Sequence, residues 1–290
     1  MILLDGKSTA QAIRAELKAI VAEQCGKGLR APGLAVILAG DSPASQVYVR
    51  NKEKACAEVG IASFPVRLPA SVAQAELLER IAALNEDPNV DGILLQLPLP
   101  EGLDPTPCLL AVAPGKDVDG FHPASMGRLA LGLPGFRPCT PAGVIELLGR
   151  YGLKTRGRKA VIVGRSNIVG KPLALMLSLR GEYGDATVTL CHSGTADLAA
   201  ECRSADFLFA AVGRPRFITA DMVREGAVVI DVGINRTSEG LCGDVDYEAV
   251  AGKARAVTPV PGGIGPMTVA MLTKNTVQAW RDHLNLDISL

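Results

Sequence analysis

Short apolar runs alternate with amphipathic segments along almost the whole chain, and this alternation constrains the fold more than any other feature. In the first part of the chain, apolar runs at 33–40, 64–68 and 91–100 are separated by helical patterns over 45–59 and 72–84. A helix between two strands returns the chain to the same end of the sheet, so the strands become parallel. The order therefore predicts a parallel, doubly wound sheet with right-handed crossovers.

The residues beside these patterns fit the ends of helices and strands. Gly60 can end the first helix, because glycine readily adopts the left-handed backbone conformation found there. Ser71 can cap the second helix through its hydroxyl. Prolines stop the third apolar run, since proline has no N–H to donate to a neighbouring strand.

The pattern is repeated after a proline-rich stretch. Prolines recur throughout 98–143, which favours a connector over a regular layer. A helical pattern over 142–152 follows, and then come four apolar runs with the sequences KAVIV, ATVTL, DFLFAAV and GAVVIDVG. An amphipathic helix over 267–284 comes last. We therefore expect an α/β fold of two lobes, each built on a mainly parallel sheet, with a cleft between them.

Composition excludes several classes of function. The 30 basic and 30 acidic side chains balance, so no global field would attract nucleic acid or an anionic membrane. No apolar run approaches the roughly 18 residues that suggest a membrane span, and the N-terminus lacks a basic leader. The seven cysteines and three histidines show neither a disulfide framework nor metal-ligand spacing. We expect a cytoplasmic protein with reduced thiols and no metal.

The segment VGRSNIVGKP, residues 163–172, follows an apolar run and has the glycines of a phosphate-binding turn. It is not a nucleotide-hydrolysing P-loop, because Gly164 lies too far from Gly170 and Pro172 replaces the hydroxyl that would bind Mg²⁺. It also departs from the dinucleotide fingerprint GxGxxG, yet the physical requirements of that fingerprint are met. Gly164 permits the tight strand-to-helix turn, the small Ser166 lets backbone approach a pyrophosphate, and Gly170 allows the helix to pack closely on the strand. We expect a helix beginning near Val169 or Gly170 to offer free N–H groups to phosphate. An ordinary strand–turn–helix corner remains the alternative.

The next strand indicates which cofactor this turn would bind. NAD-binding folds place a carboxylate at the end of that strand for the ribose hydroxyls, whereas here Cys191, His192 and Ser193 occupy the position. Arg165, Ser166 and Ser193 suit a 2′-phosphate instead. NADP is therefore preferred over NAD, with Arg165 as a merely solvated cation the alternative.

The first half of the chain carries a second set of polar residues. Tyr48 and Lys52 lie one helical turn apart, but the spacing alone favours a solvated helix face over a functional pair. Gln96 ends an apolar strand, where open α/β sheets bind ligands, and a buried glutamine needs a partner such as a lysine. Asp117 and Asp119 follow in a glycine-bounded loop. A paired-carboxylate or metal role is one interpretation, but an Asp-rich turn is the ordinary explanation.

The segment TPVPGGIGPMT, residues 258–268, is too rich in proline and glycine to be regular, and it opens the last helix. Its backbone can lie close against a flat ligand, or it can serve as a rigid hinge.

Nine segments in this order closely resemble the bifunctional methylenetetrahydrofolate dehydrogenase/methenyltetrahydrofolate cyclohydrolase family. The resemblance extends from about Asp5 to Trp280. The segments that carry it are YVRNKEKACAEVGI, DGILLQLPLP, GKDVDGFHP, RPCTPAGVIELL, VGRSNIVGKP, ATVTLCHSGT, GAVVIDVGIN, GDVD and TPVPGGIGPMTVAML.

The resemblance implies two coupled reactions. 5,10-Methylenetetrahydrofolate would give a hydride to NADP⁺, and water would open the methenyl product to 10-formyltetrahydrofolate. Lys52 matches the family's catalytic lysine, and Gln96 the amide that tunes it. Tyr48 matches the aromatic ring that stacks on the folate, and Asp119 the carboxylate that binds the pterin.

The resemblance also implies the remaining site residues and the organisation of the chain. The expected domains are a folate-binding catalytic domain over 1–138, completed by 266–290, and a Rossmann-type NADP-binding domain over 139–265. A cytoplasmic homodimer through the second lobe, serving purine and amino-acid biosynthesis, is expected. Matches to the family's NADP-contacting loops are Gly164, Arg165, Ser166, His192, Ser193 and Ile234, and those to the folate-lining segment are Pro261, Gly262 and Gly263.

Two departures from the family pattern affect local detail only: Ser125 replaces a common asparagine, and the turn over 179–185 is longer. Two other functions stay open at this point. Another two-lobed NADP-dependent dehydrogenase would explain the glycine turn but not the four polar residues of the first lobe. A regulator that binds NADP without turnover would leave the lysine unexplained.

Overall fold

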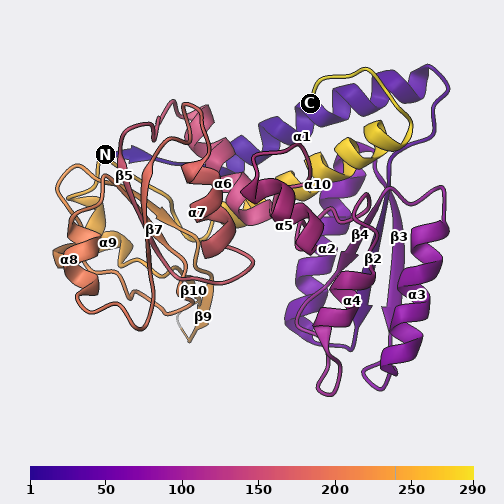
Figure 1. The fold of residues 1–290 in the computed structure, drawn as a ribbon, viewed down its shortest axis with the longest axis horizontal. Helices are drawn as coiled ribbons and strands as arrows, with labels where there is room; N and C mark the ends of the chain where they lie inside the picture. Colours follow the sequence, from indigo (N-terminus) through magenta and orange to yellow (C-terminus); the bar gives the residue numbers. More distant parts are fainter. Residues whose placement is uncertain (239) are drawn as a thin grey trace. The chain divides into compact units, whose positions relative to one another are not determined.

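The computed structural model describes residues 1–238 and 240–290 and divides into two compact units (Figure 1). Unit 1 comprises Met1–Ala10 and Thr140–Thr268, and unit 2 comprises Gln11–Cys139 and Val269–Leu290. The chain passes from one unit to the other inside three helices: α1 (Gly6–Gly26), α6 (Cys139–Arg150) and α10 (Ile264–His283).

Unit 2 is built on a three-stranded parallel sheet, as the βαβαβ pattern predicts. Strand β2 (Gly33–Ala39) lies between β3 (Ala62–Leu68) and β4 (Gly92–Leu95). All of β2 is buried, which explains its continuous apolar sequence. Strand β4 is shorter than the predicted run over 91–100: it ends at Leu95, and the prolines that follow cannot continue a ladder.

The helices of unit 2 confirm one predicted end and correct another. Helix α2 (Pro43–Val59) ends at Gly60, whose φ of 89° is the left-handed conformation expected there. Helix α3 (Gln74–Glu86) begins later than predicted: Ala73 is the residue before it, no side chain caps it, and the Ser71 prediction is wrong. The stretch over 98–143 is more than a connector, because it contains α4 (Pro105–Ala111) and α5 (Pro123–Ala130).

Asp91, which is fully buried, joins three segments of unit 2. Its carboxylate accepts hydrogen bonds from both terminal nitrogens of Arg30, at 2.6 and 2.7 Å, and from the Gly33 N–H that opens β2. It also lies 3.0 Å from Nδ1 of His283, the last residue of α10. Trp280 donates its indole N–H to the Arg30 carbonyl at 3.0 Å. The final helix is thereby fastened to the start of the sheet.

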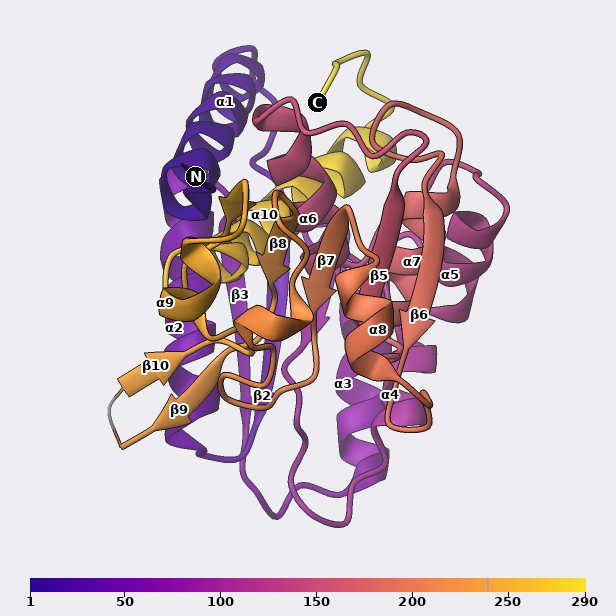
Figure 2. The same ribbon diagram turned by 90° about the vertical axis from the view of Figure 1, so that its left-hand side faces the viewer.

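Unit 1 is built on a six-stranded parallel sheet, ordered β1-β11-β8-β7-β5-β6. Chain order runs from β5 outward to β6 and then back to β7 on the other side of β5, as in doubly wound folds (Figure 2). The strands are β1 (Ile2–Leu3), β5 (Lys159–Val163), β6 (Thr187–Cys191), β7 (Phe207–Ala210), β8 (Val228–Asp231) and β11 (Ala256–Val257).

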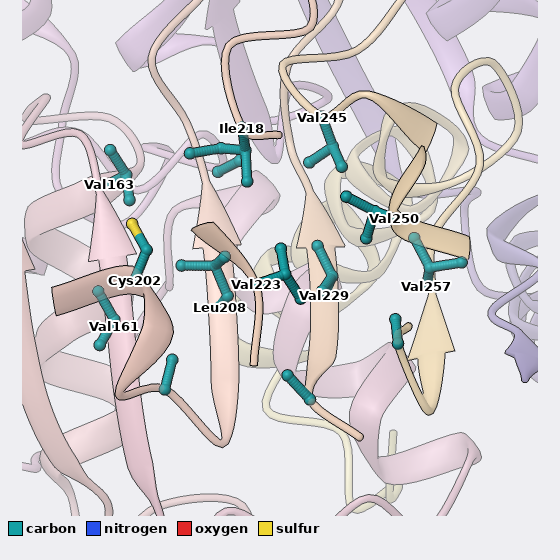
Figure 3. Packing of buried hydrophobic residues seen from close by; sticks show 14 of the residues in the cluster. Val161, Val163, Cys202, Leu208, Ile218, Val223, Val229, Val245, Val250 and Val257 are labelled. Carbon is teal, nitrogen blue, oxygen red and sulfur yellow. The ribbon is translucent and has the colours of Figure 1, made fainter. Parts of the chain in front are cut away.

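One row of apolar side chains crosses this sheet. Val161, Leu208, Val229 and Val257 are in register on four neighbouring strands and are buried beneath side chains from the surrounding helices and loops (Figure 3). Helices α7 and α8 lie on opposite faces of the sheet (Figure 2). The remaining elements are α7 (Gly170–Ser178), α8 (Leu198–Arg203), the 3₁₀ helix η1 (Ala220–Met222), α9 (Tyr247–Ala251) and the antiparallel pair β9 (Asn235–Thr237) and β10 (Gly240–Cys242).

The division into units differs from the predicted domains at the N-terminus. Residues 1–10 were expected with the first domain, but β1 pairs with β11 and extends the sheet of unit 1. The Asp5 N–H also bonds to the Tyr151 hydroxyl at 2.9 Å. A strand of two residues has too little pattern for its partner to be identified from sequence.

Candidate functional site

Lys52 and Gln96 meet in unit 2, as the sequence suggests. Lys52 lies on α2, and its Nζ donates a hydrogen bond to Oε1 of Gln96 at 3.0 Å. Gln96 follows β4 directly, is 8% exposed, and donates from Nε2 to the Leu97 carbonyl at 2.6 Å. Both polar ends of the amide are thus occupied, which holds its oxygen toward the lysine. Tyr48 lies one turn earlier on α2 and is 46% exposed, so its ring can receive a ligand.

Asp119 lies close enough to Lys52 for the two charges to interact. Burial raises the pKa of this carboxyl group to about 6, and the negative charge of Asp117 acts in the same direction. The positive charge of Lys52 opposes that rise. Near neutral pH Asp119 is therefore mostly ionised and close to its point of titration. The three residues Lys52, Gln96 and Asp119 form one polar group.

Asp117 shapes the loop that carries Asp119, so the two aspartates have different roles. Its carboxylate accepts hydrogen bonds from the backbone N–H groups of Phe121 and His122 and, at 2.7 Å, from the Ser125 hydroxyl. Ser125 is the departure from the family pattern, and it is 3% exposed. From α5, its hydroxyl hydrogen-bonds the Asp117 carboxylate and so helps to hold the loop that carries Asp119.

Two further residues support this loop, and sequence reasoning missed them. Asn275 on α10 donates from Nδ2 to the carbonyl groups of Val118, at 2.8 Å, and Arg137, at 3.0 Å. The Cys139 thiol donates to the Val118 carbonyl at 3.3 Å. In the sequence, Asn275 is one polar position in an amphipathic helix, and Cys139 is one of several scattered thiols. Neither position carries a signal of contact with residue 118.

The glycine turn in unit 1 requires glycine at both predicted positions. Gly164 has a φ of 124°, and a Cβ atom there would collide with the Ala211 carbonyl oxygen. A Cβ atom at Gly170 would collide with the Gly164 carbonyl oxygen. The turn, the residue that follows β7 and the start of α7 are therefore packed backbone against backbone.

The start of α7 differs from the expectation of free N–H groups. The helix begins at Gly170, as predicted, but the Ser166 hydroxyl accepts from the N–H groups of Val169 and Gly170, at 3.1 and 3.4 Å. The Lys171 N–H bonds to the Ser166 carbonyl at 3.1 Å, and Pro172 has none. Ser166 thus serves first as the cap of this helix. A phosphate here would depend more on Arg165 and on rearrangement of this cap.

Arg165 and Ser193 occupy equivalent places on neighbouring strands. Val163 and Cys191 are in register at the ends of β5 and β6, and each of the two residues lies two positions further on. Both side chains are exposed, at the carboxyl edge where open sheets bind ligands. Nδ1 of His192 accepts from the Gly194 N–H at 3.0 Å, so its proton is on Nε2 and available to donate.

The remaining predicted residues also belong to unit 1. Ile234 lies just beyond β8 and is 44% exposed. The Gly262 carbonyl accepts from the Lys7 N–H at 2.9 Å, and a Cβ at Gly6 would collide with the Gly263 carbonyl oxygen. The segment Pro261–Gly263 is thus packed against the start of α1. The structure brings Lys52, Gln96 and Asp119 together in unit 2, whereas the predicted cofactor residues and Pro261–Gly263 belong to unit 1.

Two searches over residues 1–238 and 240–290 gave negative results. No group of three or more His, Cys, Asp or Glu side chains is arranged to hold a metal ion. No helix in these ranges is both long and apolar enough to cross a membrane. All seven cysteines are free thiols.

Comparison with known proteins gives consistent matches over the whole chain. Residues 4–119 match the catalytic domain of the tetrahydrofolate dehydrogenase/cyclohydrolase family, and residues 138–284 match its NAD(P)-binding domain. The bifunctional protein FolD of Desulfovibrio desulfuricans is 71% identical over 283 residues, which cover 98% of this chain and 99% of that protein.

Solved structures agree. The bifunctional FolD enzyme of Campylobacter jejuni, a methylenetetrahydrofolate dehydrogenase/cyclohydrolase, superposes with a TM-score of 0.94 at 49% identity, covering 97% of this chain and 99% of that one. The Trypanosoma brucei enzyme, solved with NADP and an inhibitor, gives 0.91 at 38% identity, with 98% of both chains covered. With both units matched at such identity, the chain belongs to the tetrahydrofolate dehydrogenase/cyclohydrolase family.

Proposed function

We propose that Lys52, held by Gln96 beside Asp119, is the acid–base residue of a bifunctional folate enzyme. The chain oxidises 5,10-methylenetetrahydrofolate to 5,10-methenyltetrahydrofolate with NADP⁺ and hydrolyses that product to 10-formyltetrahydrofolate. The observation that carries the residue assignment is the 3.0 Å hydrogen bond from Nζ of Lys52 to Oε1 of Gln96, next to a partly buried carboxylate.

In the hydrolytic step, Lys52 moves the proton. In its uncharged form Nζ has one lone pair, which can accept a proton from the water that attacks the methenyl carbon. The same nitrogen can then give a proton to the ring nitrogen as the ring opens. Gln96 directs the amine, because its oxygen takes one N–H while its own N–H is held by the Leu97 carbonyl. The lone pair is thus aimed by a side chain that is itself fixed.

Binding of the pterin falls to Asp119 and Tyr48. An ionised carboxylate can accept two parallel hydrogen bonds from the amino and ring N–H groups of a pterin, which fixes its orientation. The exposed ring of Tyr48 can stack on the flat bicycle from the preceding turn of α2. Pro261, Gly262 and Gly263 of unit 1 are proposed as further folate contacts on the resemblance to the family alone.

The residues at the edge of the unit 1 sheet fit NADP. The cofactor supplies the hydride acceptor of the first reaction. Gly164 and Gly170 let the turn pack closely against Ala211 and the start of α7, and Arg165 with Ser193 offers a cation and a hydroxyl suited to a 2′-phosphate. His192 can donate from Nε2, and Ile234 presents an apolar surface beyond β8. Their contribution is to bind and orient the dinucleotide.

A coupled assay tests the proposal. NADPH absorbance is followed after 5,10-methylenetetrahydrofolate and NADP⁺ are added, and the formyl product is then determined. Lys52→Met should lower the hydrolytic rate by at least about a hundredfold, the usual scale of acid–base catalysis, and should impair the oxidation as well. Lys54→Met removes an exposed amine from the same helix and should leave both rates unchanged. Normal hydrolysis by the Lys52 variant would remove this lysine from the mechanism.

The same assay separates the alternatives. A regulator that binds NADP without turnover gives no NADPH signal, and a dehydrogenase for a small keto acid does not act on the folate.

We also propose a homodimer through unit 1, a cytoplasmic location, no nucleic-acid or membrane partner, and a supply of one-carbon units to purine and amino-acid biosynthesis. The balanced charge supports the absence of a polyanionic partner. Sedimentation at a series of concentrations tests the dimer.

A further inference from the structure

Two buried aspartates in unit 1 take no part in the mechanism above. Asp231, the last residue of β8, is 3% exposed, and Asp244, after β10, is fully buried. Burying a carboxylate is costly unless donors replace the water it loses. Most of these donors are backbone N–H groups of loops, and one is the side chain of Asn235 at the start of β9.

Asp244 holds one loop along its whole length. Oδ2 accepts from the N–H groups of Val212 and Gly213, at 2.6 and 2.9 Å, and Oδ1 accepts from that of Arg214 at 2.9 Å. Three consecutive N–H groups that point at one carboxylate fix the backbone of the loop. Oδ1 also accepts from Nδ2 of Asn235 at 2.8 Å, and this hydrogen bond connects the segment after β8 to Asp244.

Asp231 holds Asp244 in turn. Its carboxylate accepts from the N–H groups of Gly233, Asp244 and Val245, at 3.0, 2.9 and 2.9 Å. The two segments also interlock through their glycines. A Cβ at Gly233 would collide with the carboxylate of Asp244, and a Cβ at Gly243 would collide with that of Asp231. Each carboxylate therefore fills the space that the glycine of the other segment leaves open.

The held loop lies where a doubly wound sheet binds its dinucleotide. The strand order reverses between β5 and β7, and the crevice at such a point, beyond the carboxyl ends of the strands, is the usual ligand site. Residues 211–214 follow β7 directly, and the Ala211 carbonyl packs against Gly164 of the glycine turn. Gly213 and Arg214 are exposed to solvent, although the buried Asp244 carboxylate accepts hydrogen bonds from their N–H groups.

We infer that Asp244 is a positioning residue for the cofactor: its buried carboxylate preforms loop 212–214 and, through Asn235, the segment at Ile234 for NADP⁺. The inference rests on the proposed function for the identity of the ligand. The carboxylate is needed because all its contacts here are N–H donors. An asparagine would keep one acceptor oxygen and turn an NH₂ group toward N–H groups.

The first experiment measures NADP⁺ binding directly, by calorimetric titration of the full chain. Asp244→Asn should raise the dissociation constant at least about tenfold, as expected when hydrogen bonds to a charged acceptor are lost. The KM for the folate should change less than about threefold, because the catalytic group lies in unit 2. The control is Asp246→Asn, which makes the same charge change two residues away and keeps a side chain able to cap α9.

Unchanged NADP⁺ affinity in a folded Asp244→Asn protein overturns the inference. So does an equal loss of hydrolytic activity and NADP⁺ affinity, which would mean a general disturbance. Wild-type protein that binds NADP⁺ but does not oxidise the folate would refute the proposed function and leave this inference standing.

A second measurement needs no variant and decides the matter if Asp244→Asn fails to fold. Amide hydrogen exchange of the free wild-type protein should show slow exchange at Val212, Gly213 and Arg214, with little further slowing on addition of NADP⁺. Rapid exchange at 212–214 that slows only with NADP⁺ would show a loop ordered by the ligand, and the inference would be wrong.

Discussion

Catalytic efficiency should fall as Asp119 takes up a proton. Burial raises the pKa of this carboxyl group from 3.8 to about 6, and only the ionised form can accept both N–H groups of a pterin. With a pKa of about 6, roughly nine-tenths of the protein carries the ionised form at pH 7 and about one-tenth at pH 5. The kcat/KM for 5,10-methylenetetrahydrofolate should therefore drop about tenfold between those values, since this ratio reports titration of the free enzyme.

The assay is the initial rate of NADPH formation at saturating NADP⁺, measured in small steps of pH. Asp119→Asn should have a lower kcat/KM at pH 7 and should not show the fall in kcat/KM between pH 7 and pH 5, because an amide does not titrate in this range. Asp231, whose pKa burial also raises to about 6, remains in that variant and controls for effects on unit 1. A flat profile from pH 5 to 7 in the wild-type protein would refute the reasoning.

The same shift has a consequence for stability with a definite sign. Because the folded pKa lies above the unfolded one, the native state holds the proton more tightly between about pH 4 and 6. The contribution of Asp119 to the free energy of unfolding should therefore fall as pH rises through this window, by at most about 3 kcal/mol. Urea unfolding of wild type and Asp119→Asn across the window measures it, and parallel curves would contradict the assignment.

Three further predictions concern the cofactor turn and the fastening of α10. Arg165→Ala should raise the KM for NADP⁺ about tenfold or more, while the KM for the folate stays within about twofold. The control is Arg158→Ala, which removes a cation just before the start of β5. Equal effects of Arg165→Ala on both KM values would indicate misfolding. Gly164→Ala should weaken NADP⁺ binding in a titration, because its Cβ would displace the turn from Ala211; unaltered affinity would contradict the close packing. Asp91→Asn should lower the free energy of urea unfolding by about 3 kcal/mol, because it removes the charged partner of a buried pair, and an unchanged midpoint would show that the pair contributes little.

The alternation of apolar runs was enough to predict the two parallel sheets, because a strand buried on both faces leaves a continuous apolar run in the sequence. The contact between Lys52 and Gln96 was implied by the resemblance to the family. The residues alone indicated only that a glutamine ending a buried strand needs a partner such as a lysine, and the spacing of Lys52 favoured a solvated helix face.

Other features lie beyond such patterns. The support of the Asp119 loop by Asn275 joins residues 157 positions apart, and nothing in the local sequence marks either end. The cap on α7 reversed an expectation, because the Ser166 hydroxyl can turn toward the helix or toward a ligand and the sequence does not say which. The Ser71 prediction failed because a hydroxyl near a helix start is common, whereas capping also needs the helix to begin in the right place.

The interleaving of the two units has a consequence for biosynthesis. Unit 2 is completed only by residues 269–290, which are synthesised after residues 140–268 of unit 1. Until that final segment emerges, the carbonyl of Arg30 lacks its indole donor and Asp91 lacks its imidazole neighbour. A nascent chain must therefore keep unit 2 unfinished while residues 140–268 are being made, and a chain truncated before residue 269 would lack the indole and the imidazole that pack against Arg30 and Asp91.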